Sequence, residues 1–542
     1  MKKRFCAWTA CLFLMATLLT ACSNPFGEAK DGSGDKQVLN LVENSEPVNL
    51  DTARLIDDSS VKIMNNVMEG LMRLDQDNQP QPAMAKGLPE ISSDRRTYTF
   101  KIREAEWSDG KPVRAQDFEY AWKRALDPKI QSEYAYILYP LLNAEKYNKG
   151  EVGADEVGVK ALNDHTLQVR LEKPIPYFLS LTAFITYLPQ RQDIVEKYGD
   201  QYAKEDENMV FNGPFKLAEW THENSYRYKK NDRYWDRDRV SLDTINVQIV
   251  QDHSTAISLY QANKADVVAL DSQLVGAFEN SKEFVRVDSG TVYFLRYNTV
   301  NDFLSNADIR RAISMAVDRE ELVDKVLKDD TPAGGMVPPP IRGYGGRLFR
   351  DQTEEKVKYD PEKAKELLEK GMDDLGIDTM PTIDLLTYND DRKKVAVLIQ
   401  EQLKRILGLN VRIDPQPQKQ KFELEKAGNF QLSLVRWTGD YDDPMTFLDM
   451  WHSNNPINFG HWKNTEFDSL IDRSKDTVDY RQREVNLIKA EKLLVDDAGV
   501  APLYYERESY LHKPRVKNLY RHPVLAKYSL KWVSIQKKKE KK

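Results

Sequence analysis

Two hydrophobic periods alternate along most of this 542-residue chain, and this alternation limits its fold more than any other feature. Runs such as TYTFKIR (97–103), TLQVRL (166–171) and TINVQIV (244–250) repeat apolar side chains at every second position, which predicts strands. Helical patterns lie between such runs, for example over residues 360–371 and 306–327. The chain is therefore predicted to have an α/β fold in which strands and helices interleave throughout.

The two helical segments carry boundary signals of their own. In the first, Asp360 is expected to cap the N-terminus, Pro361 to occupy the first helical position and Gly371 to end the helix. In the second, residues 306–327, a break is expected near Asp318.

The N-terminus has the pattern of a secreted, lipid-anchored protein. Basic residues 2–4 precede an apolar run that ends at Leu19 and is too short to span a membrane comfortably. The sequence LTAC that follows, ending at Cys22, resembles a bacterial lipoprotein signal, in which the cysteine is acylated and becomes the new N-terminus. Residues 1–21 are thus predicted to be a signal peptide and 22–37 a flexible tether. An ordinary secretory leader with a chance cysteine is the alternative.

Cysteine content and charge narrow the possible functions. Cys6, Cys11 and Cys22 are the three cysteines, so the chain after Cys22 has no thiol for a disulfide, a zinc cluster or nucleophilic catalysis. Removal of residues 1–21, which carry three positive charges, changes the formal net charge from −6 to −9. An acidic surface argues against nucleic acid as a partner and favours cationic or zwitterionic ligands. The end of the chain, 536–542, is expected to be a solvated basic tail.

Motifs for metal, cofactor or enzymatic chemistry are missing from the sequence. The seven histidines include no HExxH pair, and there is no P-loop, no GxSxG, and no GxGxxG that opens a helix. The glycine-rich stretch GYGGR (343–347) is expected to be a loop. No metal site, no cofactor and no enzymatic activity are therefore expected.

One acidic stretch needs an explanation. In WTGDYDDP (437–444) three carboxylates fall within four positions, next to a tryptophan and a proline. A metal ion, a catalytic proton, a positively charged ligand and water alone could each be what these carboxylates hold.

Several stretches, in order along the whole mature chain, together resemble the oligopeptide-binding proteins of ABC peptide importers. The segments that carry the resemblance are VMEGLMRLD (67–75), WSDGKPVRAQDFEYAWKRALDP (107–128), FNGPFKLAEW (211–220), YWDRDRVSLDTI (234–245), IRRAISMAVDREELV (309–323), YDPEKAKELLEKG (359–371), GDYDDPMTFLDMW (439–451) and APLYYE (501–506). The resemblance implies a protein that captures oligopeptides and delivers them to ABC transporter permease subunits. It would be a monomer, lipid-anchored on the extracytoplasmic face of the cell membrane.

The family's fold is a large two-lobed periplasmic-binding-protein fold of the cluster C type, with an extra subdomain in the N-terminal lobe. Carried over to this chain, the resemblance implies lobe I at 38–70, 204–295 and 510–535, the extra subdomain at 71–203 and lobe II at 296–509.

The resemblance also suggests an answer for the acidic stretch. In the family, the aspartate of the DY pair takes the ligand's free α-amino group, and here that position is Asp440. A buried ammonium needs a counter-charge, which a carboxylate supplies. Asp442 and Asp443 are expected to start the next helix, where acidic residues are favourable. The strand predicted at 431–437 would pair with the backbone of an extended peptide.

Further ligand contacts are implied around this strand. Trp437 and Tyr441 would line the cleft, and Tyr134 and Tyr293 fall where members of the family place ligand-facing aromatic residues. The peptide's C-terminal carboxylate has two candidate partners, Arg436 and Arg392. Arg436 is a candidate because Leu434 stands where some members have an arginine, and a residue two positions on shares the same strand face.

Other functions stay open on the sequence alone. A related binding protein could take a signalling peptide, a murein peptide, haem or a nickel chelate. A surface-anchored hydrolase or a purely structural, adhesive lipoprotein would be of a different class.

Overall fold

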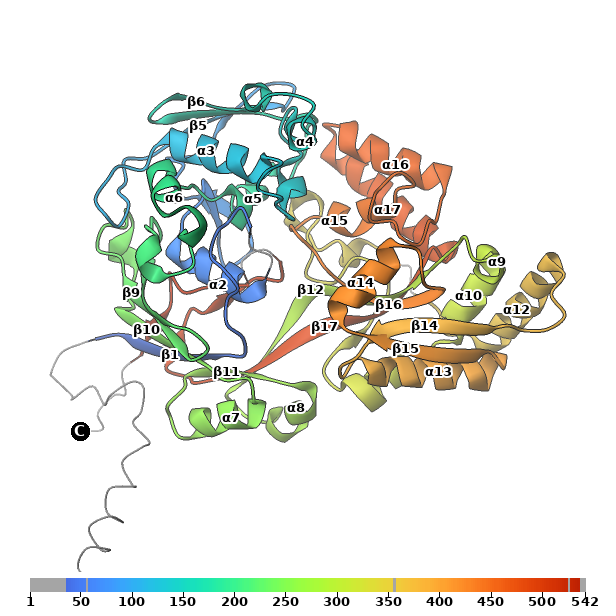
Figure 1. The fold of residues 1–542 in the computed structure, drawn as a ribbon. Coiled ribbons are helices and arrows are strands. Elements are labelled where there is room, and N and C mark those ends of the chain that lie inside the picture. Colours follow the sequence, from blue (N-terminus) through green and yellow to red (C-terminus); the bar gives the residue numbers. More distant parts are fainter. Residues whose placement is uncertain (1–35, 55–56, 354–356, 525–526, 537–542) are drawn as a thin grey trace, which may run out of the picture. The chain divides into compact units, whose positions relative to one another are not determined.

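One sheet of eleven strands runs through the protein, and helices pack around it (Figure 1). The structure is a computed structural model that describes residues 36–54, 57–353, 357–524 and 527–536. The predicted signal peptide and Cys22 lie outside the described residues. From edge to edge the sheet contains β15 (Asn410–Gln416), β14 (Thr382–Tyr388), β16 (Leu432–Thr438), β12 (Phe284–Tyr297), β17 (Val500–His512), β11 (Val267–Leu270), β1 (Val38–Glu43), β10 (Thr244–Ile249), β9 (Ser225–Lys230) and β8 (Phe215–Thr221), and β13 (Thr331–Pro332) pairs with β17.

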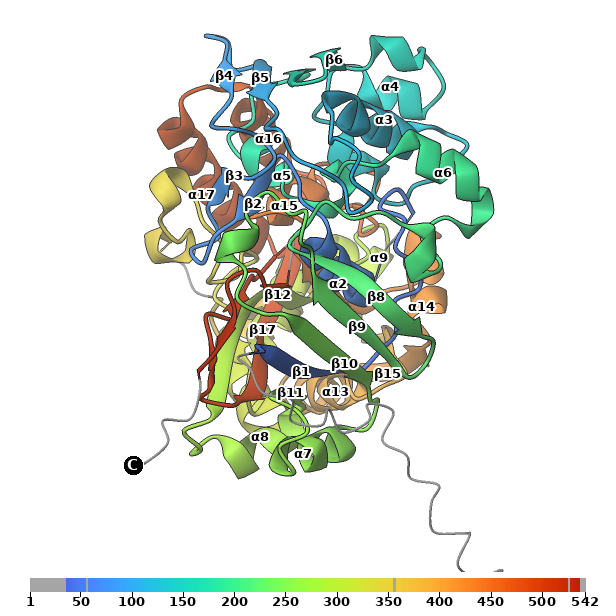
Figure 2. The same ribbon diagram turned by 90° about the vertical axis from the view of Figure 1, so that its left-hand side faces the viewer.

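The two longest strands, β12 and β17, form the centre of this sheet (Figures 1 and 2). They pair antiparallel from Phe284 opposite Leu511 to Arg296 opposite Val500, with shifts of register after Asp288 and after Tyr293. β11, β1, β10, β9 and β8 continue the sheet on one side of the pair, and β16, β14 and β15 continue it on the other. Both halves of the sheet therefore depend on the same pair of strands.

A second sheet of four strands lies within the predicted extra subdomain. Its order is β4 (Glu90–Ile91), β5 (Thr97–Lys101), β7 (Thr166–Arg170) and β6 (Val159–Asn163), and α3 (Ala115–Leu126) packs against β6 and β7. The strands predicted from TYTFKIR and TLQVRL are β5 and β7, and that predicted from TINVQIV is β10 of the large sheet. The α/β class and these three strands are confirmed.

The helix predicted at 360–371 forms, but its predicted end is wrong. α12 runs over Pro361–Leu375, and the Asp360 side chain caps it by accepting a hydrogen bond from the backbone N–H of Lys363. The helix stops at Gly376, whose φ of 64° lies in the left-handed region. Gly371 instead allows a close helix contact, because a Cβ there would lie 2.5 Å from Ile309 Cγ1 of α10 (Ala307–Ala316).

The break predicted near Asp318 is confirmed. α10 ends at Ala316, and α11 (Arg319–Leu322) starts after Asp318, whose side chain accepts a hydrogen bond from the Glu321 N–H. The remaining α-helices of the described residues are α2 (Asp58–Val67), α4 (Ala144–Asn148), α5 (Phe178–Leu181), α6 (Gln192–Tyr198), α7 (His253–Gln261), α8 (Ser272–Phe278), α9 (Asp302–Ser305), α13 (Lys393–Leu407), α14 (Gln418–Lys426), α15 (Met445–Leu448), α16 (Thr465–Asp476) and α17 (Tyr480–Asp496). The remaining strands form three small pairs, β2 (Met72–Leu74) with β3 (Pro80–Pro82), β18 (Val516–Lys517) with β21 (Ser534–Ile535), and β19 (Tyr520–Arg521) with β20 (Tyr528–Ser529).

The described residues from Val38 onward form one compact unit. Within the described ranges, no helix has the length and apolar character that crossing a membrane requires.

A buried carboxylate ties the start of this unit to its end. The Asp266 side chain, fully buried at the start of β11, accepts hydrogen bonds from the backbone N–H of Asn40 in β1 (2.9 Å) and from Arg515 Nε (2.7 Å). A buried carboxylate is stable only with such partners. Three segments that are far apart in sequence therefore depend on this one side chain.

We predict that Asp266→Ala lowers the free energy of unfolding by about 3 kcal/mol, since it removes charge-assisted hydrogen bonds and leaves a backbone N–H without its acceptor. Denaturant titration measures the change. Glu279→Ala, which removes an exposed carboxylate just after α8, is the control and should change stability by less than about 0.5 kcal/mol. Equal stabilities for the two variants would contradict this role of Asp266.

Candidate ligand-binding site

The acidic stretch 437–444 lies where β16 ends and the chain turns into α15, and its three carboxylates have different surroundings. Asp443 is buried and forms a two-pronged ion pair with Arg483 of α17, with N–O distances of 2.8 and 2.9 Å. Its Oδ1 also accepts a hydrogen bond from the backbone N–H of Met445, the first residue of α15. Asp443 therefore starts the helix, as predicted, and anchors it to α17.

Asp442 does not start the helix. Its Oδ1 accepts a hydrogen bond from the backbone N–H of Arg342 (2.8 Å), the residue just before the glycine-rich stretch 343–347. Burial raises the pKa of the Asp442 carboxyl to about 7, although the Arg342 backbone N–H and guanidinium both lower it. The expectation for this residue was wrong, because a distant loop rather than α15 supplies its partner.

Asp440 has no basic partner among the described residues. Its Oδ2 accepts a hydrogen bond from the hydroxyl of Tyr136 (3.0 Å), and its backbone N–H donates to Thr446 Oγ1 (3.1 Å). Burial raises the pKa of the Asp440 carboxyl to about 7, and the Tyr136 hydrogen bond offsets this only in part. A positively charged group beside Asp440 would supply the missing counter-charge.

The strand that leads to Asp440 has one edge that is mostly unpaired. β12 pairs with β16 along its whole length, from Leu432 to Thr438. On the other side, β14 pairs only with Leu432 and Ser433. Within the described residues no strand pairs with positions 434–438 on this side, although the Arg436 backbone N–H already has the Tyr388 hydroxyl as a partner. An extended peptide backbone can be added along the rest of this edge.

Three of the predicted aromatic residues lie near this strand end. Trp437 is partly buried and donates its indole N–H to the backbone carbonyl of Thr446 (3.0 Å). Tyr441 stacks on Tyr177 with ring centroids 4.3 Å apart and planes 9° apart. Tyr134 packs against Tyr136, which is the tyrosine that reaches Asp440.

Arg436 is already paired with a carboxylate. Its guanidinium donates to Glu506 of β17 (3.0 Å), and the Tyr293 hydroxyl donates weakly to the other Glu506 oxygen (3.4 Å). Burial alone would lower the pKa of Arg436, but Glu506 and Tyr293 raise it. Leu434 is fully buried in the core, so Arg436 is the first residue of this strand face that emerges from it. Tyr293 is itself largely buried and stacks on Tyr504.

Arg392 is also paired. It lies just before α13, donates to both oxygens of Asp390 (Nε to Oδ1, 2.9 Å) and covers the ring of Tyr388 at 3.4 Å from the centroid. Each of the two predicted arginines therefore already has a carboxylate partner. The sequence analysis missed Tyr136 and Glu506, because their partners are 304 and 70 positions away and no local pattern marks them.

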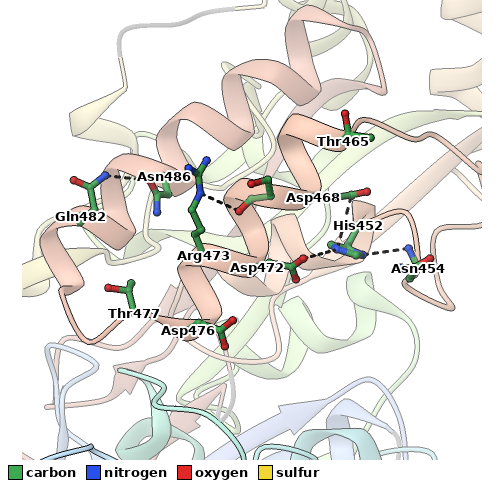
Figure 3. A pocket seen from close by; sticks show the side chains of 11 residues that line it. His452, Asn454, Thr465, Asp468, Asp472, Arg473, Asp476, Thr477, Gln482 and Asn486 are labelled. Carbon is green, nitrogen blue, oxygen red and sulfur yellow. Dashed lines mark hydrogen bonds and ion pairs between the residues drawn. The ribbon is translucent and has the colours of Figure 1, made fainter.

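A separate pocket of about 810 Å³ lies beside α16 and α17 (Figure 3). His452, Asp468, Asp472 and Arg473 are among the residues that line it, and it includes none of the predicted ligand residues. Among the described residues no group of three or more His, Cys, Asp or Glu side chains is placed to hold a metal ion.

Comparison with known proteins shows one consistent family. A family model described as bacterial extracellular solute-binding proteins, family 5, middle region, matches residues 79–459. Dipeptide-binding protein DppE of Bacillus subtilis is 38% identical over 524 residues, which cover 95% of this chain and 96% of DppE. Oligopeptide-binding protein OppA of the same organism is 36% identical and covers 96% of this chain and 97% of its own length.

Solved structures agree on the fold. OppA of Listeria monocytogenes bound to peptide superposes with a TM-score of 0.78 and 34% identity, covering 93% of this chain and 100% of that one. The predicted two-lobed α/β fold is thereby confirmed. The family model matches residues 79–459, and relatives aligned over almost their full length are more than 30% identical. This chain therefore belongs to family 5 of the bacterial extracellular solute-binding proteins.

Proposed function

We propose that this protein captures oligopeptides outside the cytoplasm and delivers them to the permease subunits of an ABC importer. The observation that carries the proposal is Asp440, a carboxylate at the end of a half-paired strand with only a neutral hydroxyl as its side-chain partner in the described structure. The names of the relatives DppE and OppA agree with a peptide ligand.

Two features of the site fit a peptide in particular. The open edge of residues 434–438 offers hydrogen bonds to an extended backbone, which every peptide has whatever its side chains. Asp440 follows directly at the end of that edge and offers a counter-charge to an α-ammonium. The two features together recognise an extended chain with a free N-terminus, held without any chemical change to it.

The two-lobed fold suggests how the ligand is enclosed. We place lobe I at 38–70, 204–295 and 510–535, with the extra subdomain at 71–203, and lobe II at 296–509. The Tyr136–Asp440 and Tyr177–Tyr441 contacts join the proposed subdomain to lobe II beside the amine position. A bound peptide would thus be covered from both sides. The protein would act as a monomer, which a lipid on Cys22 anchors to the membrane.

We predict that Asp440→Ala weakens peptide binding by roughly two to four decades, because loss of one partner of a buried charge pair costs about 3–5 kcal/mol. Isothermal titration calorimetry with a free and an N-acetylated peptide, on wild type and variant, gives the coupling between the carboxylate and the amine. Acetylation should weaken binding strongly in wild type and much less in the variant.

Glu369→Ala, which removes an exposed carboxylate of α12, is the matched control and should bind both peptides as wild type does. An acetylation penalty of the same size with and without Asp440 would show that this carboxylate does not hold the amine.

The raised pKa of Asp440 also predicts how binding depends on pH. The free protein holds a proton on Asp440 below about pH 7, whereas the complex needs the carboxylate, so binding releases a proton there. Affinity should therefore fall about tenfold per pH unit from pH 7 towards pH 5. It should also fall above about pH 8, where the peptide's α-amino group loses its charge.

Calorimetry between pH 5 and pH 9 measures both limbs of this profile. In Asp440→Asn the acidic limb should disappear, because no carboxyl is left there to titrate. An acidic limb that persists unchanged in Asp440→Asn would assign it to another group and contradict the proposed role.

The lipid anchor has its own test. In Cys22→Ala the acyl acceptor is missing, so the protein should be released into the medium or keep its leader. Cell fractionation and mass spectrometry of the N-terminus measure both outcomes. Cys11→Ala, a change within the leader, should leave processing and membrane association intact. Normal membrane association of the Cys22→Ala protein would contradict lipid anchoring at this residue.

A further inference from the structure

A buried group of charged residues with an excess of positive charge lies beside the proposed peptide site. Arg296 of β12 and Lys421 and Glu425 of α14 are 3%, 1% and 5% exposed. Arg296 Nη1 lies 3.3 Å and Lys421 Nζ lies 3.1 Å from the same oxygen, Glu425 Oε1. Two cations therefore share one carboxylate.

Part of the hydrogen-bonding capacity of these cations is not used. The contacts with Glu425 are ion pairs, and within the described residues Lys421 Nζ and Arg296 Nε have no partner at good hydrogen-bond geometry. Burial lowers the pKa of Lys421 to about 8 and lowers that of Arg296, although Glu425 raises both. A buried ammonium without acceptors is costly, and a second anion would satisfy it.

Tyr388 connects this group to the open edge of β16. Its ring centroid lies 4.8 Å from Lys421 Nζ and 3.4 Å from Cζ of Arg392. Burial and Glu425 raise the pKa of the Tyr388 phenol, whereas Arg392 and the backbone N–H of Arg436 lower it. Tyr388 therefore contacts both the cations and β16. The Arg436 and Arg392 guanidiniums already have Glu506 and Asp390 as partners, whereas Arg296 and Lys421 have one carboxylate between them.

We propose that Arg296 and Lys421 form a subsite for a carboxylate of the bound ligand, so that the protein prefers peptides with an acidic group at one fixed position. The proposal rests on the proposed peptide-binding function. Alternate side chains of an extended peptide point to opposite faces, so a peptide added to residues 434–438 presents only certain positions to this subsite. The carboxylate can come from an Asp or Glu side chain or from the C-terminus of a short peptide.

The test compares otherwise identical alanine-based peptides that carry one Glu or one Gln at each position in turn, each as free acid and as C-terminal amide. Calorimetry with wild-type protein should show Glu favoured over Gln at one position by about ten- to a hundredfold, as expected for hydrogen bonds to a charged group. If the C-terminus is the source, amidation rather than the Glu-to-Gln change should cause this loss.

Lys421→Met keeps an unbranched side chain of similar length and removes the ammonium. It should reduce the preference for the carboxylate to less than about threefold and leave binding of the neutral peptides unchanged. Lys419→Met, which removes an exposed ammonium from the same helix, is the matched control and should keep the full preference. The melting temperature of ligand-free Lys421→Met should be equal to or above that of wild type, because Arg296 and Glu425 remain as a balanced pair.

Three results would overturn the proposal. Neutral and acidic peptides that bind equally well, with no effect of amidation, would remove the subsite and leave peptide binding intact. A Lys421→Met protein with a lower melting temperature and equal losses for Glu and Gln peptides would show that the group is only structural. Failure of every peptide to bind would reject the proposed function and the subsite together.

Discussion

The pairing of β12 with β17 is the constraint on which the rest of the structure depends. Both strands are long enough to belong to both halves of the sheet, so β11 and β1 extend from one flank and β16 extends from the other. Because β16 pairs with β12 along its full length, the position of Asp440 is fixed relative to β12 and β17. A ligand site at the end of β16 therefore lies close to the strands that both halves share.

Two carboxylates of the acidic stretch, Asp443 and Asp440, have different surroundings and different roles. Asp443 gains a guanidinium and a helix N–H, so its burial holds α15 and α17 together. Asp440 is partly buried, has only the Tyr136 hydroxyl as a side-chain partner and has a raised pKa, so it can take an ammonium as its counter-charge. The same residue type, three positions apart, thus has a structural role at Asp443 and a proposed binding role at Asp440.

Local features of the fold could be predicted from the sequence, and contacts over long distances in the chain could not. The cap at Asp360 and the break at Asp318 depend on neighbouring backbone, and both occur as predicted. The helix end predicted at Gly371 was wrong, because a glycine needed for close packing against Ile309 looks the same in the sequence as a glycine that ends a helix. The resemblance led to Asp440, but its Tyr136 partner comes from a segment 304 positions earlier that no periodicity connects to it.

Arg436 and Arg392, the two arginines predicted from the sequence, already have carboxylate partners. Charge balance therefore makes Arg296 and Lys421, which the sequence did not indicate, better candidates for a carboxylate subsite. Strand alternation correctly placed Arg436 on the face of Leu434, yet the same face brings it to Glu506, which neutralises it. A paired guanidinium gains little from a second carboxylate, since binding must compete with an existing contact. Arg296 and Lys421 share a single carboxylate, and among the described residues Lys421 Nζ and Arg296 Nε have no hydrogen-bond partner. A ligand anion there would supply acceptors that the fold does not. Selectivity for the ligand would then depend on which buried cations the fold leaves incompletely neutralised.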